Sequence, residues 1–204
     1  MLLALAVLAG VMLSPKVGLS APVITSWMEG RGFMSSLQPL LVPGLLGGVG
    51  GGIAIVLIST LFNPWLPAEA EAHISTLGQL LPLTTRVLYG GITEELLMRW
   101  GLMTLLVWGI WRGTMKRHPQ PTSACFHAAI IISAVIFGIG HLPLAFLIVP
   151  DATFALIAYV IIANSAFGVV AGYLYWKRGL EAAILAHMIA HVVMFTASQL
   201  GVYY

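Results

Sequence analysis

The chain has 204 residues, of which 59% are hydrophobic and only 8% are charged, and its formal net charge is +2. A soluble domain normally carries roughly 25% charged residues, so we expect most of this protein's surface to face lipid. The composition excludes a cytosolic enzyme and a disordered tail. The small net charge argues against a nucleic-acid partner, and the single cysteine excludes an internal disulfide.

Residues 1–39 are predicted to form an N-terminal region, an apolar segment followed by a cytoplasmic linker. Residues 1–13 are apolar but extend only about 20 Å as a helix, which is less than the hydrocarbon core of about 30 Å. No basic residue precedes this segment, which disfavours a signal peptide. We therefore expect a short or tilted helix that continues past Pro15.

Residues 40–204 are predicted to form the membrane-embedded domain, an all-α polytopic bundle of about five to six transmembrane helices around a central polar pocket. A helix needs roughly 20 apolar residues to cross a bilayer. The runs that meet this need are 40–62, 83–111, 124–142, 153–176 and 180–203. The second of these runs is unusual, because it also carries Arg86, Glu94, Glu95 and Arg99.

The run 40–62 contains six glycines between residues 44 and 52. Several of them are four residues apart, a pattern that lets two membrane helices approach closely. No GxxxxGK[ST] sequence follows, which argues against a phosphate-binding loop. We therefore expect these glycines to pack against other helices.

The charged residues between the runs predict the orientation of the bundle. Basic residues flank the cytoplasmic ends of membrane helices. The basic residues at one side of the expected bundle are Lys16, Arg31, Arg112, Lys116, Arg117, Lys177 and Arg178. The loops at the other side hold the acidic residues Glu69, Glu71 and Asp151. We therefore expect the first side to face the cytoplasm.

Six ionisable residues interrupt the apolar runs, namely Glu94, Glu95, Arg99, His141, His187 and His191. Such groups are costly in hydrocarbon unless they are paired or hydrated, so they are candidates for a functional site. At about 1.5 Å per residue, four of them lie in one band near the middle of the membrane. The sequence therefore predicts that Glu94, His141, His187 and His191, from three helices, form one site.

Helical spacing indicates different roles for these residues. Glu95 and Arg99 are four residues apart in the order that favours an ion pair. Glu94 points about 100° away from Glu95, and a carboxylate in a polar pocket can act as a general base toward water. His187 and His191 share one helix face, from which two imidazoles can donate to a developing oxyanion.

Three segments resemble the motifs of the CPBP family, which includes type II CAAX prenyl endopeptidases and bacteriocin-processing and immunity proteins. Residues 94–99 (EELLMR) resemble its EExxxR motif, and residues 137–141 (FGIGH) its FxxxH motif. Residues 187–191 (HMIAH) resemble its HxxxN motif, except that His191 stands where the family commonly has Asn. The order of the motifs matches, and the resemblance covers residues 83–199, the expected protease-like core.

The resemblance implies a glutamate-dependent intramembrane endopeptidase that uses no cofactor and no metal. In the family, the first glutamate of the pair and the histidine of the second motif activate water, which implies these roles for Glu94 and His141. The third motif is thought to stabilise the oxyanion, which implies this role for His187 and His191. The second glutamate and the arginine of the first motif look structural, in agreement with the ion pair expected above.

The expected partners are the lipid bilayer and a membrane-associated substrate. The substrate classes that the resemblance implies are a CAAX-like protein, a peptide precursor and a protein with a C-terminal sorting signal. The small size and short loops resemble the bacterial branch of the family. This favours a peptide or protein precursor over a prenylated one, and a location in a bacterial cell membrane.

Three alternatives stand beside the protease. A non-catalytic immunity or scaffold protein of the same fold is favoured by the histidine at position 191. A zinc-dependent membrane protease is conceivable because histidine and glutamate are zinc ligands, although the HExxH signature is absent. A proton-coupled transporter is the third, because chains of glutamate and histidine also build proton relays.

Overall fold

The computed structural model describes residues 1–67, 70, 76, 81–114, 118–150 and 152–202, and this part of the chain is helical and contains no strand. The elements before the first long gap are α1 (Leu2–Val17), α2 (Pro22–Met28), α3 (Phe33–Phe62) and the short 3₁₀ helix η1 (Asn63–Trp65). A long helical path follows, made of α5 (Leu83–Leu88), η2 (Tyr89–Glu94), η3 (Leu96–Met103) and α6 (Thr104–Thr114). The last elements are α7 (Ser123–Gly140), α8 (Leu142–Ile148), α9 (Phe154–Arg178) and α10 (Leu180–Gln199).

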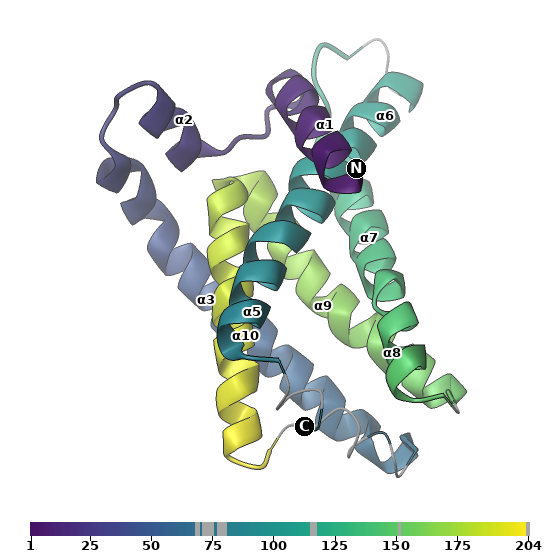
Figure 1. Ribbon diagram of the computed structural model, residues 1–204. Helices are drawn as coiled ribbons and strands as arrows, with labels where there is room; N and C mark the ends of the chain where they lie inside the picture. The colour runs from purple at the N-terminus through teal and green to yellow at the C-terminus, as the bar shows by residue number, and fades with distance from the viewer. Residues whose placement is uncertain (68–69, 71–75, 77–80, 115–117, 151, 203–204) are drawn as a thin grey trace.

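The long helices make this an integral membrane protein. Four segments are long and apolar enough to cross a bilayer, and they are Phe33–Trp65, Ser123–Ile148, Phe154–Arg178 and Leu180–Gln199. The pair α1 and α2 adds a further candidate, although it is bent by 96° at its break. The path from α5 to α6 is long enough to cross a bilayer at about 1.5 Å per residue, but it carries the charged motif. The predicted all-α polytopic bundle is confirmed (Figure 1).

The helical path from α5 to α6 carries residues 94–99 and is the motif-bearing helix. Its middle part is wound more widely than an α-helix. Both η2 and η3 are π-helical, with only Glu95 between them. π-helical turns are rare and occur frequently at functional sites. In η2, Gly90 and Gly91 are buried, and a Cβ at Gly91 would overlap the side chain of Met188 in α10. The wide winding therefore coincides with a close approach of this helix to α10.

The glycines of α3 pack against two neighbouring helices, as expected from their spacing. A Cβ at Gly44, Gly48 or Gly52 would lie less than 3 Å from one side chain of α10, and these side chains are Leu185, Ile189 and Val193. The α10 residues repeat every four positions, as the glycines do, so the two helices match along their length. Small residues of α3 thus hold α10 close to the centre of the bundle.

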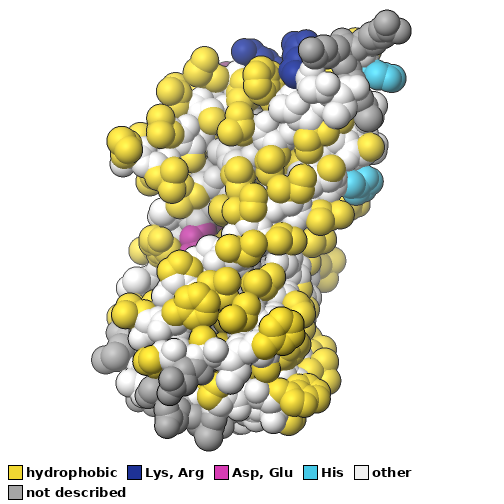
Figure 2. Space-filling model, turned by 90° about the vertical axis from the view of Figure 1, so that its right-hand side faces the viewer, with side chains coloured by type: hydrophobic (Ala, Val, Ile, Leu, Met, Phe, Trp, Pro, Cys, Tyr) yellow, Lys and Arg dark blue, Asp and Glu magenta, His cyan; other side chains and the backbone are white. Residues whose placement is uncertain are grey.

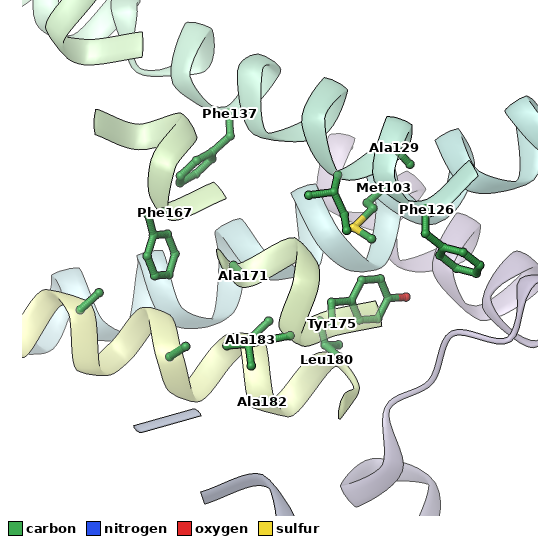
Figure 3. Close-up of a cluster of buried hydrophobic side chains, with 14 of the residues drawn as sticks. Met103, Phe126, Ala129, Phe137, Phe167, Ala171, Tyr175, Leu180, Ala182 and Ala183 are labelled. Carbon is green, nitrogen blue, oxygen red and sulfur yellow. The ribbon is translucent and has the colours of Figure 1, made fainter. Parts of the chain in front are cut away.

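A cluster of buried side chains fills the space between η3, α7, α9 and α10. Aromatic rings from α7 and α9 lie opposite small residues of α10, including Ala182 and Ala183 (Figure 3). Phe167 and Tyr175 are each only 1% exposed. The alanines let the helix backbones approach, and the rings fill the remaining volume. This packing fixes the three helices that carry the expected site.

The expected division between residues 39 and 40 does not coincide with the end of a helix. That boundary falls inside α3, which begins at Phe33 and contains Pro39 and Pro43. Proline usually ends a helix, but it is tolerated in membrane helices, where neighbouring groups satisfy the freed backbone. The expected continuation of the first helix past Pro15 is confirmed, since α1 ends at Val17.

α1 packs on the motif-bearing helix, and the start of α2 holds the start of α10. A Cβ at Gly10 of α1 would overlap the ring of Trp100 in η3. The backbone N–H of Leu180 donates to Ser20 O at 3.0 Å. Glu181 Oε1 accepts from the backbone N–H groups of Val23 and Ile24, at 3.0 and 2.9 Å. The first turn of α10, two turns before His187, is therefore attached to the N-terminal region.

Basic residues gather at one end of the molecule. Lys16, Arg112, Lys177 and Arg178 lie in the last turns of α1, α6 and α9, which end on the same side of the bundle (Figure 1). Figure 2 shows Lys and Arg side chains at this end and a largely hydrophobic surface below it. Assignment of this end to the cytoplasm stays a prediction. Arg31, also used for it, is described and pairs with Glu29. The remaining charged residues used for it lie outside the described residues, namely Glu69, Glu71, Lys116, Arg117 and Asp151.

Candidate active site

A cavity of about 530 Å³ lies between the helices. Residues of α3, α5, η2, α7, α8, α9 and α10 and the residue between α7 and α8 line it. The four residues expected to form one site, Glu94, His141, His187 and His191, all line this cavity. Its other walls are largely apolar, with Leu144, Ile148, Leu156 and Val160 among the lining side chains. The cavity therefore combines a small polar cluster with a surface suited to apolar groups.

Glu94 is the carboxylate that faces the cavity. Its side chain is 19% exposed, whereas that of Glu95 is fully buried. Glu94 Oε2 lies 3.8 Å from His187 Nε2. This distance is longer than a direct hydrogen bond. Glu94 is therefore close to an imidazole of another helix while its carboxylate stays open to the cavity.

Glu95 connects three helices beside the cavity-lining His187. Its Oε1 lies 3.0 Å from Arg99 Nη1 and 2.7 Å from His187 Nδ1. Arg99 is 1% exposed, and its Nη2 donates to Gly168 O of α9 at 3.1 Å. The ion pair expected from the spacing is thus present, and it also binds α10. The bond from Glu95 to His187 was missed by the sequence reasoning, because spacing reports contacts only within one helix.

The hydrogen-bond partners define which ring nitrogens of His141 and His187 carry a hydrogen. His141 Nδ1 lies 2.8 Å from Phe137 O, and a carbonyl oxygen only accepts. His187 Nδ1 faces the Glu95 carboxylate, which is also an acceptor. Both Nδ1 atoms therefore donate. In a neutral ring the Nε2 atom is then an acceptor, so both imidazoles can receive a proton at Nε2.

His191 lies next to His187 on α10, with the two rings stacked at 5.0 Å between centroids and 12° between planes. Gly90 of η2 faces both rings. A Cβ at this position would overlap Nε2 of His191 and lie 3.2 Å from Nε2 of His187. The missing side chain at Gly90 thus allows the two imidazoles to approach the motif-bearing helix.

Two phenylalanines support the histidines. The Phe167 ring lies 4.5 Å from the His187 ring, and the Phe137 ring lies 4.7 Å from the His141 ring. Phe137 also lies under the Arg99 guanidinium, with 4.9 Å from Cζ to the ring centroid. The aromatic residue of the second motif therefore positions a histidine and covers the buried ion pair.

Some polar residues of the cavity were missed by the sequence reasoning. Asn164 of α9 and Arg86 of α5 line the cavity. The Arg86 Nε donates to Leu81 O at 3.1 Å, and Asn164 Nδ2 donates to Val160 O at 2.7 Å. The signal for Asn164 was present in the sequence, since it is an amide within the apolar run 153–176. An uncharged residue carries a weaker signal than a charged one.

The described residues do not form a cluster suited to a metal ion. In the described parts of the chain no three His, Cys, Asp or Glu side chains converge on one point. Cys125 is fully buried, and it is not among the residues that line the cavity. The donors in the described part of the chain therefore do not fit a zinc site.

These features define a membrane-embedded helical protein with an acid and imidazole cavity, the class to which intramembrane proteases belong. A family model described as type II CAAX prenyl endopeptidase Rce1-like matches residues 76–193. The match covers more than half of the chain, and the chain belongs to this protease family, as the motif resemblance predicted. The comparisons with curated proteins and with solved structures gave no match.

Proposed function

We propose that this protein is a glutamate-dependent intramembrane endopeptidase that cleaves a membrane-associated peptide or protein precursor. The observation that carries the proposal is the shared cavity of Glu94, His141 and His187 inside a helical membrane bundle. Ionisable groups inside a membrane are costly unless they are paired or hydrated, so they often mark a functional site. Membership of a protease family supports hydrolysis of a peptide bond.

Glu94 and His141 activate the water in this mechanism. Glu94 takes one proton from the water, and His141 Nε2 accepts the second hydrogen bond and orients it. The water oxygen forms a bond to the carbonyl carbon, the carbon–nitrogen bond then breaks, and the proton held by Glu94 passes to the leaving amine. The second water hydrogen stays on the new carboxyl group, so the products are a carboxylic acid and an amine, and no redox partner is needed.

His187 and His191 stabilise the negative charge that develops on the carbonyl oxygen. His191 donates directly from its ring N–H. His187 gives its Nδ1 hydrogen to Glu95, so it donates from Nε2 when the ring carries two protons. Glu95 and Arg99 hold His187 in place through their buried ion pair.

The apolar walls of the cavity favour a substrate with apolar side chains near the cleaved bond. The family name indicates a CAAX-type protein, while the short loops favour a peptide or protein precursor in a bacterial cell membrane. Proteomics of cells that carry wild-type protein or Glu94→Gln identifies the substrate as a precursor that accumulates in the variant.

The direct test uses purified protein in lipid nanodiscs and quenched fluorescent peptides, with and without a C-terminal farnesyl group. Removal of the base is expected to lower the rate in Glu94→Gln by about 10²–10⁴-fold. The matched control is Glu29→Gln, the same substitution at an exposed carboxylate that pairs with Arg31 outside the cavity. Full activity of Glu94→Gln would refute the proposed function.

Two alternatives predict other outcomes. Inactivation by a chelator with recovery on addition of zinc would favour a zinc protease, whereas the proposal predicts activity in the chelator. A non-catalytic immunity protein is suggested by His191 at the Asn position of the motif. It predicts a biological activity that Glu94→Gln leaves intact.

A further inference from the structure

Asn164 is one of the polar side chains of the cavity that have no role in the proposed function. Asn164 lies on the face of α9 that lines the cavity, between the apolar residues Val160 and Phe167. Polar groups within membrane helices are costly when they have no partner, and they often mark a substrate pathway. The position of Asn164 among the site residues therefore needs an explanation.

Asn164 lies at the level where α9 crosses α7. A Cβ at Gly138 of α7 would lie 2.5 Å from Ile161 O and 2.7 Å from Ser165 Oγ, so α7 contacts the turn of α9 that contains Asn164. His141 follows Gly138 by three residues, about one helical turn. Asn164 and His141 therefore lie at neighbouring levels along the cavity that both of them line.

The next turn of α9 leads to the other histidines. Phe167 follows Asn164 by three residues, and its ring lies 4.5 Å from the His187 ring. At about 1.5 Å per residue along the axis, Asn164 lies about 4.5 Å from the level of this contact. Asn164 is thus placed between the level of His141 and the level of His187.

The amide of Asn164 is fixed in one orientation. Its Nδ2 lies 2.7 Å from Val160 O, one turn earlier in α9. A carbonyl oxygen only accepts, so the amide group on this side is the NH₂. This bond uses one of the two N–H groups and holds the side chain in place. A primary amide has a second N–H, and Asn164 lines the cavity in which a substrate would bind.

An oxyanion is stabilised by several converging donors, and the proposed function assigns His191 as the one that donates directly. Glu94 offers only acceptor oxygens, and neutral His141 and His187 each present an acceptor Nε2 because their Nδ1 atoms donate elsewhere. A peptide carbonyl oxygen that gains negative charge needs donors. The sequence has histidine at position 191 where the motif commonly has an amide. Asn164 supplies an amide from α9 in the same cavity.

We propose that Asn164 donates its second amide N–H to the carbonyl oxygen of the peptide bond that is cleaved, together with His191. The inference rests on the proposed function, and it adds a catalytic residue outside the three sequence motifs. The amide binds the oxygen most strongly when the oxygen carries negative charge, so Asn164 acts mainly on the rate of bond cleavage.

The test compares Asn164→Leu with wild-type protein in lipid nanodiscs, using the farnesylated and unfarnesylated quenched peptides. Leucine keeps the approximate shape and removes the donor. Loss of one oxyanion donor is expected to lower kcat by about 10²–10³-fold, with little change in KM. The matched control is Ser165→Ala, which removes a hydrogen bond to Ala134 O of α7 beside the cavity lining. It is expected to keep the wild-type kcat.

A second measurement separates this role from a structural one. A peptide aldehyde forms a tetrahedral adduct with water and imitates the intermediate, whereas the matching peptide alcohol does not. Asn164→Leu is expected to weaken the aldehyde by the same factor as kcat/KM and to leave the alcohol unchanged. Both affinities are measured on the folded protein, so their ratio reports the role of Asn164 even if the variant is less stable.

The outcomes distinguish the inference from the proposed function. A wild-type kcat in Asn164→Leu, or an unchanged ratio of aldehyde to alcohol affinity, overturns the role of Asn164. The proposed function stands in that case if Glu94→Gln is inactive. No cleavage by the wild-type protein, or full activity of Glu94→Gln, counts against the proposed function and the inference together.

Discussion

Glu94 and Glu95 are neighbours in the sequence but lie in different surroundings. A difference of one residue turns a helical side chain by about 100°, so Glu94 faces the cavity while Glu95 points into the protein. Glu95 is fully buried and contacts both Arg99 and His187. The same residue type therefore supplies a candidate base at one position and a structural anchor at the next.

Loss of Arg99 is expected to destabilise the protein strongly. In Arg99→Leu the Glu95 carboxylate stays buried without its cationic partner, which costs about 3–5 kcal/mol. The double variant Glu95→Leu with Arg99→Leu removes both charges and is expected to be more stable than Arg99→Leu alone. Unfolding in mixed micelles with increasing denaturing detergent measures both variants. Wild-type stability of Arg99→Leu would contradict the role given to the ion pair.

The site residues could be predicted to different extents from the sequence. Glu94, Glu95, Arg99 and the histidines were recognisable because charged or imidazole groups interrupt apolar runs. The bond between Glu95 and His187 was not, because it joins positions 92 apart in the chain. Contacts of this kind depend on how the helices pack, and the spacing within one helix does not report them.

At the scale of the elements, the π-helical segment η2 brings the motif-bearing helix and α10 together. Its glycines face Met188 and His191, so the backbone of η2 lies against the imidazoles. The apolar runs predicted where helices occur but not this winding. The winding is a property of the contact with α10, and it leaves no periodic pattern in the sequence.

Gly90→Ala is expected to disturb the site through this contact. The added Cβ would overlap His191 Nε2 and displace the ring, so the rate of cleavage is expected to fall by at least about tenfold, less than for loss of a whole oxyanion donor. Gly109→Ala in α6 is the matched control, because among the described residues nothing beyond its chain neighbours and its own helix backbone lies within 4 Å of the added Cβ. Equal activity of the two variants in the nanodisc assay would argue against the contact.

The whole molecule has one basic end and a cavity that lies away from it. The basic residues in the last turns of α1, α6 and α9 mark the end predicted to be cytoplasmic. Trp65, which is 66% exposed, follows α3 at the opposite end. The all-α class and the approximate positions of the four long apolar helices followed from the apolar runs. The position of α1 against η3 did not, because both surfaces are apolar and many pairings of such surfaces are possible.

The orientation can be tested with single cysteines, because Cys125 is the one cysteine in the sequence. In a Cys125→Ala background, Trp65→Cys is expected to react with a membrane-impermeant maleimide on intact cells. Lys177→Cys is expected to react only after the membrane is permeabilised, because basic ends face the cytoplasm. The reverse labelling pattern would show that the basic end faces outward.

The central claim is that side chains from separate membrane helices act as one unit on one water molecule. Groups that act as a unit give strongly non-additive effects when they are removed together. Glu94 and His141 come from different helices and line one cavity, so a double-mutant cycle of these two residues examines the claim directly.

The measurement is kcat/KM for wild-type protein, Glu94→Gln, His141→Ala and the double variant, all in lipid nanodiscs with one quenched peptide. Each single variant is expected to lose most of its kcat/KM, and the double variant is expected to have nearly the same kcat/KM as the less active single variant. Losses that multiply in the double variant, or a His141→Ala variant with wild-type activity, would contradict the central claim.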